Sequence, residues 1–148
     1  MNAAPPTAEL AIRAETDEVR RASSWLEQAG SERGVPPDQI HRLDLCLNEV
    51  LANVISYGGP SVQSAPVMLH LEVTREGGSH EAAVTVSDAG VAFDTPGAMP
   101  RPAPESLTDA QAGGLGIVMI HSFSDTLRYR RDGVLNRLTF AVRWQDAG

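Results

Sequence analysis

Residues 43–58, LDLCLNEVLANVISYG, decide how this chain folds. At about 100° per residue, one side of this stretch collects apolar side chains within about a third of the circumference, which predicts a helix packed on a core. The stripe consists of Ile40, Leu43, Leu47, Val50, Leu51 and Val54. Glu49 and Asn53, spaced i and i+4, lie together on the other side. The pair can hold a base and a metal ligand side by side, or it can be an ordinary solvated pair.

The composition of the chain indicates a soluble, globular protein. Its 148 residues suit one compact domain, which we place at residues 8–146, and residues 1–7 are expected to be disordered. The net charge of −7 argues against a sequence-independent nucleic-acid binder, although it leaves room for a nucleotide pocket. Cys46 is the one cysteine, so no intramolecular disulfide can form, and packing is preferred to a reactive role.

The location expected from the sequence is the cytoplasm. No apolar run approaches the length of a membrane span, and the N-terminus lacks the basic start and apolar core of a secretory signal. No membrane partner is therefore expected.

The hydrophobic pattern around the opening stretch predicts the other elements. Thr16 is expected to cap a helix, and Pro37 suits the first turn of the next one. The resulting order, β-α-α-β-β-loop-α-β-β, predicts a two-layer α/β sandwich with helices on one face of a mixed, mostly antiparallel sheet. Strands are predicted for residues 9–14, 67–74, 82–86, 125–131 and 135–144, and helices for residues 17–33, 37–57 and 117–123.

A proline-rich loop at about residues 94–112 interrupts this order. Pro96, Pro100, Pro102 and Pro104 preclude regular structure there, and a loop of this length in a compact domain is usually functional or disordered.

Two short motifs flank the loop. Asp88-Ala89-Gly90 follows a predicted strand, where an aspartate can accept a hydrogen bond from an exocyclic amine, or can simply form a turn. GGLGI at residues 113–117 precedes a predicted helix, where backbone N–H groups suit a phosphate, or where glycines simply make a hinge. The glycine motif does not match the P-loop pattern.

Taken together, these motifs resemble the GHKL ATPase superfamily. Its members carry an E-x-x-x-N box, a D-x-G box and a glycine-rich box around a mobile ATP lid, on the two-layer Bergerat fold. The runs DAGVAFDTP, GGLGIVMI and DTLRYRRDGVLNRLTF are most similar to the small anti-sigma-factor serine/threonine kinases of bacterial partner-switching systems.

The resemblance implies a role for each motif residue. Glu49 would be the general base toward the acceptor serine, and Asn53 would coordinate Mg²⁺ that bridges the ATP phosphates. Asp88 would bind the adenine amino group, and Gly90 would let the base approach. The remaining cofactor-binding residues would be Gly113, Gly114 and Gly116 at the phosphates and Phe93, which would anchor the start of the lid or would simply pack in the core.

The implied function is that of an anti-sigma factor that is also an ATP-dependent protein-serine kinase. Its partners would be a sigma factor, a STAS-type anti-sigma-factor antagonist as the phosphorylation substrate, and a second copy in a homodimer. The alternative is a non-catalytic module of the same fold that holds nucleotide or a partner. The basic run Arg128, Arg130 and Arg131 is interpreted as a solvated or partner-contacting face.

Overall fold

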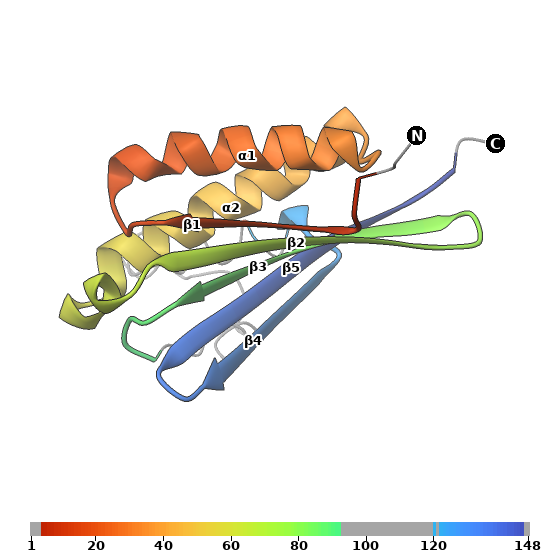
Figure 1. Cartoon of the computed structure of the whole chain (residues 1–148). Coiled ribbons are helices and arrows are strands. Elements are labelled where there is room, and N and C mark those ends of the chain that lie inside the picture. The colour runs from red at the N-terminus through yellow and green to blue at the C-terminus, as the bar shows by residue number, and fades with distance from the viewer. Residues whose placement is uncertain (1–3, 93–119, 121, 147–148) are drawn as a thin grey trace.

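The computed structural model describes residues 4–92, 120 and 122–146, which form one five-stranded sheet with two long helices packed on it (Figure 1). The strands lie in the order β1-β2-β3-β5-β4, and each neighbouring pair is antiparallel. Their bounds are β1 Thr7–Ile12, β2 Val67–Glu76, β3 Ser79–Asp88, β4 Thr126–Asp132 and β5 Leu135–Gln145. The predicted α/β sandwich is confirmed, and the described sheet is antiparallel throughout rather than mixed.

Strict alternation of side chains explains the central strands. In β2 the apolar residues Val67, Leu69, Leu71 and Val73 are buried, whereas Met68 and its polar neighbours along the strand point to the other face. The turn between β2 and β3 uses Gly77 at φ 63°, a left-handed conformation that favours glycine. β2 and β3 pair antiparallel and form a hairpin around this turn.

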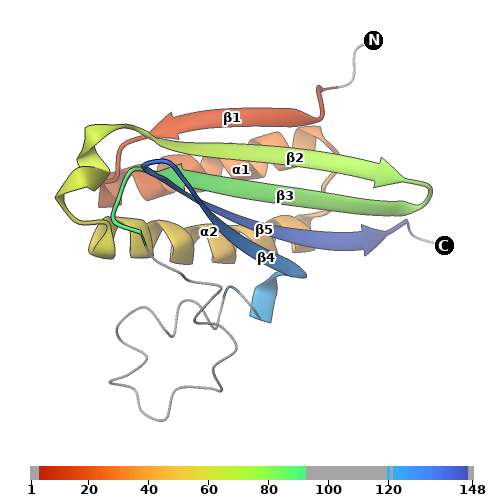
Figure 2. The same ribbon diagram turned by 90° about the horizontal axis from the view of Figure 1, so that it is seen from below.

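The two helices, α1 Val19–Glu32 and α2 Pro37–Tyr57, cover the same face of the sheet. Figure 2 shows the sheet from its other side, with both helices behind it. Pro37 occupies the first turn of α2 as expected, because its missing N–H has no partner to lose there.

The expected cap at Thr16 is wrong. Thr16 instead begins a short 3-10 helix, Thr16–Glu18, and α1 starts only at Val19, with no side-chain hydrogen bond from the capping position Glu18. A capping residue needs a non-helical backbone, which Thr16 loses by entering this extra turn.

The core lies between α2 and the sheet. All six residues of the predicted α2 stripe are buried, and Cys46 is buried with them. α2 packs on β5 and β3, where Phe140 is the largest fully buried side chain. One connected cluster of buried residues extends from Ile12 to Val142. The inward stripe of α2 therefore fixes which side of the helix turns away from the core.

Among the helices that the structure describes, none has the length and apolar character that crossing a membrane requires.

Candidate functional site

Glu49 and Asn53 lie on α2 at the margin of its buried stripe. Both side chains are half-buried, and neither has a hydrogen-bond or ion-pair partner within the described part of the chain. Their i, i+4 spacing places them on successive turns of one side of the helix. The arrangement leaves a carboxylate and a carboxamide available to a ligand.

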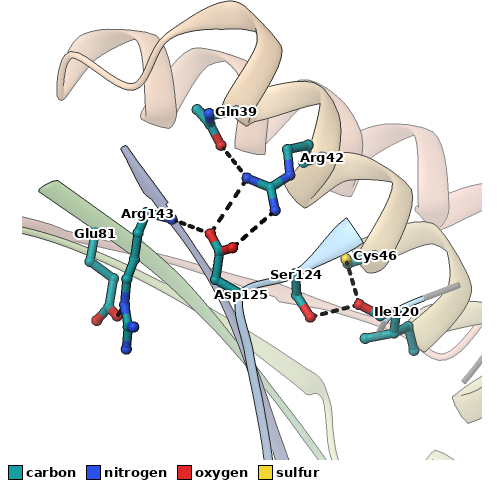
Figure 3. A network of polar contacts seen from close by, with 8 residues as sticks. All are labelled: Gln39, Arg42, Cys46, Glu81, Ile120, Ser124, Asp125 and Arg143. Atoms are coloured by element: carbon teal, nitrogen blue, oxygen red, sulfur yellow. Dashed lines mark hydrogen bonds and ion pairs between the residues drawn. The ribbon is translucent and has the colours of Figure 1, made fainter. Parts of the chain in front are cut away.

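The same side of α2 carries Arg42 and Cys46, which anchor the helix to residues just before β4 (Figure 3). Arg42 forms an ion pair with Asp125 at 3.4 Å, and the Cys46 thiol donates to the Ile120 carbonyl at 3.7 Å. Asp125 also accepts from the Arg143 backbone N–H at 2.6 Å. These contacts bring the chain back at Ile120 beside the turn of α2 that precedes Glu49.

The chemical state of Cys46 follows from its burial. Burial raises the pKa of the Cys46 thiol to about 12, the positive charge of Arg42 opposes this shift, and the negative charge of Glu49 adds to it. The thiol is therefore protonated at neutral pH, which agrees with the predicted packing role rather than a reactive one.

The D-x-G motif forms a tight loop at the end of β3. Asp88 is only 2% exposed, and its Oδ1 accepts hydrogen bonds from the Gly90 backbone N–H at 2.8 Å and from Asn136 Nδ2 at 3.1 Å. Neither of these bonds uses Oδ2. The carboxyl group is thus held in one orientation by contacts to a single oxygen.

This loop packs directly on the C-terminal end of α2. The Val91 N–H donates to the Gly58 carbonyl at 2.8 Å. A Cβ at Gly90 would stand 2.8 Å from Asp88 Oδ1 and 2.8 Å from the Gly58 carbonyl oxygen. Glycine is therefore required at position 90 for this backbone contact, whereas its predicted role in admitting a base stays a prediction. The contact joins the Asp88 loop to the helix that carries Asn53, at a point just beyond that residue.

Two residues beside the Asp88 loop, Asn136 and Tyr129, were not predicted from the sequence. Asn136 is fully buried, and its amide contacts the Asp88 loop, Tyr129 and Arg131. The sequence did carry a signal for Asn136, because it lies two and four residues before the inward residues Leu138 and Phe140 and therefore points to the same face of the strand. For Arg131 the interpretation as a solvated or partner-contacting face is incomplete, since its guanidinium donates to the Gly90 carbonyl at 2.9 Å.

Several predicted site residues lie outside the described part of the chain. They are Phe93, the lid at about residues 94–112, Gly113, Gly114 and Gly116. Of the predicted third helix, Ile120, Ser122 and Phe123 are described, and all three are helical.

The described residues fit the nucleotide and the metal that the sequence motifs predict. Asp88 provides an oriented, buried carboxylate for an amine, and Asn53 provides an amide oxygen of the kind that Mg²⁺ accepts beside phosphate oxygens and water. No group of three or more His, Cys, Asp or Glu side chains suited to an all-protein metal site occurs among the described residues. A magnesium ion held mainly by phosphates needs no such group.

Comparison with known proteins identifies the relatives of this chain. Residues 12–142 match a sequence family described as the histidine kinase-like ATPase domain. Serine/threonine-protein kinase BtrW of Bordetella bronchiseptica is 32% identical over 139 residues, which cover 94% of this chain and 94% of BtrW.

Two solved structures share the fold. The RsbU and RsbW domains of Rv1364c from Mycobacterium tuberculosis match 96% of this chain with a TM-score of 0.67 and 12% identity, and this chain spans 34% of that longer one. The second is a chain of the SiaB-SiaC complex from Pseudomonas aeruginosa, with a TM-score of 0.62 and 12% identity. The match covers 91% of this chain and 88% of that chain.

Proposed function

Because this chain belongs to the histidine kinase-like ATPase domain family, we propose that it is an ATP-dependent protein-serine kinase that also acts as an anti-sigma factor. It binds a sigma factor, and it phosphorylates a STAS-type antagonist on serine. The relation to the kinase BtrW over nearly the whole chain supports the kinase assignment.

One observation in the structure carries the proposal. The Val91–Gly58 hydrogen bond joins the loop that carries Asp88 to the end of the helix that carries Glu49 and Asn53, which supports the assignment of these residues to one nucleotide site. In this proposal the base of the nucleotide lies at Asp88 and its phosphates lie toward α2.

Each described residue has a distinct role at this site. Asp88 accepts a hydrogen bond from the adenine amino group, and Asn53 holds Mg²⁺ through its amide oxygen. The magnesium ion, when bound, neutralises charge on the phosphates. The glycines 113, 114 and 116 contribute backbone N–H groups to phosphate in this proposal, and Phe93 anchors the lid.

Glu49 serves as the general base. The serine Oγ of the antagonist forms a bond to the γ-phosphorus as the bond from that phosphorus to the β–γ bridging oxygen breaks, and ADP leaves. The hydroxyl proton passes to the Glu49 carboxylate. A positioned base of this kind typically contributes about 10²- to 10⁴-fold to the rate.

The partners belong to the proposal as well. SiaB has been solved in a complex with SiaC, and its fold is shared by this chain, which supports a protein partner for this fold. The sigma factor, the STAS-type substrate and a homodimer follow from the partner-switching family that the sequence resembles.

The alternative function is a non-catalytic module that binds nucleotide or a partner without transferring phosphate. Incubation with γ-³²P-labelled ATP, Mg²⁺ and the STAS protein encoded nearest in the genome separates the two. Label on a serine of the STAS protein is the expected result. ATP binding without transfer would favour the alternative, and absence of ATP binding would overturn the nucleotide site.

A further inference from the structure

A row of three polar residues crosses the sheet beside the Asp88 loop. Asp88 on β3 lies directly opposite Asn136 on β5, and Asn136 lies directly opposite Arg131 on β4. Residues directly opposite on neighbouring strands point to the same face. A carboxylate, an amide and a guanidinium therefore stand side by side in a sheet whose neighbouring inward positions are apolar.

The amide of Asn136 can adopt only one orientation. Its Oδ1 accepts from the Tyr129 hydroxyl at 2.6 Å and from Arg131 Nη1 at 3.1 Å. Its Nδ2 donates to Asp88 Oδ1 at 3.1 Å and to the carbonyls of Gly90 and Val91 at 3.3 and 2.9 Å. In a flipped amide the NH₂ group would face the donor Arg131, and the oxygen would face three acceptors. The hydrogen-bond partners therefore determine which amide atom is the oxygen and which is the nitrogen.

Arg131 reinforces the same loop from the edge strand. Its Nη1 bridges the Asn136 oxygen and the Gly90 carbonyl at 3.1 and 2.9 Å. Arg130, the next residue back along β4, points to the opposite face, where it pairs with Asp132 at 3.9 Å. The two arginines carry equal charge one residue apart, and Arg131 is the one that touches the D-x-G loop.

We propose that Asn136 and Arg131 are positioning residues that make the site selective for an adenine over a 6-oxopurine. The proposal rests on the assignment of Asp88 to the purine amino group. Asn136 and the Gly90 N–H together engage Asp88 Oδ1, so the carboxylate cannot rotate, and Oδ2 is left as a fixed acceptor. A 6-amino group donates to that oxygen, whereas the 6-oxo group of a hypoxanthine base presents a second acceptor and is repelled.

Loss of either positioning residue releases this constraint. Without Asn136, Asp88 Oδ1 and two loop carbonyls lose a shared donor. Without Arg131, the Gly90 carbonyl and the Asn136 oxygen lose theirs. The carboxyl group and the loop then sample more orientations, which weakens the interaction with adenine and lessens the rejection of a 6-oxopurine.

The test compares the Kd values of ATP and ITP, measured by titration calorimetry with Mg²⁺, for the wild type and for Arg131→Ala, Arg130→Ala and Asn136→Ala. The wild type is expected to prefer ATP by at least about tenfold, since a buried hydrogen-bonding group without its partner carries a large penalty. The ratio of the two Kd values should fall about threefold or more in Arg131→Ala and in Asn136→Ala. Arg130→Ala, which has the same change in charge on the same strand, should keep the wild-type ratio.

The ratio distinguishes positioning from a purely structural role. A variant that only loosens the fold weakens ATP and ITP equally and leaves the ratio unchanged. If Asn136→Ala fails to fold, Arg131→Ala still tests the positioning role, because Arg131 is exposed and its loss should leave the fold intact. This inference would be overturned if Arg131→Ala kept the wild-type ratio of the two Kd values, or if the wild type showed no preference for ATP over ITP. Neither result would contradict the proposed kinase function. A wild type that binds no ATP would overturn both.

Discussion

Glu49 is the residue on which the proposed transfer step depends most directly. Its carboxylate has no partner among the described residues and lies one helical turn from Asn53. Glu49→Gln keeps the shape of the side chain but removes its capacity to accept a proton. Transfer to the STAS protein should fall by at least about 100-fold, while the Kd for ATP stays within about threefold of the wild type.

A matched control for this variant lies on the neighbouring helix. Glu27 on α1 is exposed, and Glu27→Gln makes the same change in charge away from the site. Both variants are compared by initial rates of label transfer at saturating ATP. Full activity in Glu49→Gln would remove Glu49 from the chemistry.

Cys46 predicts a dependence of stability on alkaline pH. Burial raises the pKa of its thiol from an ordinary value of 9.0 to about 12, so the folded protein keeps the proton that the unfolded chain releases. The stabilising contribution is complete below pH 9 and is lost as pH rises toward 12. Between pH 8 and pH 10.5 the wild type should lose about 2 kcal/mol more unfolding free energy than Cys46→Ala does.

The measurement is urea unfolding of both proteins at the two pH values. The two proteins share every other ionisable group, so only the difference between the two pH dependences reports on Cys46. Equal losses of stability in the wild type and in Cys46→Ala would show that the thiol ionises as easily in the folded state as in the unfolded one.

Residue spacing located only part of the candidate site. Glu49 and Asn53 are four apart on one helix, so periodicity alone puts them together. Asp88 and Asn136 are brought together by strand pairing, and a shift of one residue would turn Asn136 to the opposite face. The sequence shows that Asn136 shares a phase with apolar residues but does not show which strand it faces.

At the next scale, α2 is a helix held at both ends. Its N-terminal half is tied to Asp125 through Arg42 (Figure 3). Its C-terminal end is tied to Val91, whose backbone N–H donates to the Gly58 carbonyl. Between these contacts lie Glu49 and Asn53. The position of Glu49 and Asn53 relative to the Asp88 loop therefore depends on how the whole of α2 packs on the sheet.

The Arg42–Asp125 contact predicts a small, salt-sensitive coupling energy. The side chains are 28% and 37% exposed, so solvent screens the ion pair, and a double-mutant cycle with alanine at both positions should give about 0.5 kcal/mol. Asp125→Ala should cost more than Arg42→Ala, because Asp125 also accepts from the Arg143 backbone N–H. Urea unfolding at 50 mM and about 1 M NaCl is the measurement, and the coupling should vanish at the higher salt concentration. A coupling that is unchanged by salt would contradict a screened surface pair.

The elements themselves were largely predictable, whereas their order in the sheet was not. Alternation in β2, β3 and β5 reports one buried face, and it located each of these strands within a few residues. Nothing in that alternation states that β5, rather than β4, pairs with β3. That choice depends on contacts between segments far apart in the chain, and it is what places Asn136 against Asp88.

In the molecule as a whole, the helix that carries the proposed ligand-binding residues also forms part of the hydrophobic core. One core cluster spans from Ile12 to Val142, and α2, which carries Glu49 and Asn53, lies at its centre. A ligand that binds only the folded state stabilises the entire domain by mass action. Global unfolding therefore reports on the site without a kinase substrate.

ATP with Mg²⁺ should raise the melting temperature of the wild type, and Asp88→Asn should abolish most of this shift. At 100 times Kd the ligand stabilises by about 2.7 kcal/mol, which corresponds to roughly 5–10 °C for a domain of this size. In Asp88→Asn the amide oxygen can replace Oδ1 as the acceptor for the Gly90 N–H and Asn136, so the fold should persist. The other position then becomes an NH₂ donor, which faces the adenine amino group with like polarity. Differential scanning fluorimetry measures both effects, and a wild-type shift in a folded Asp88→Asn protein would separate Asp88 from nucleotide recognition.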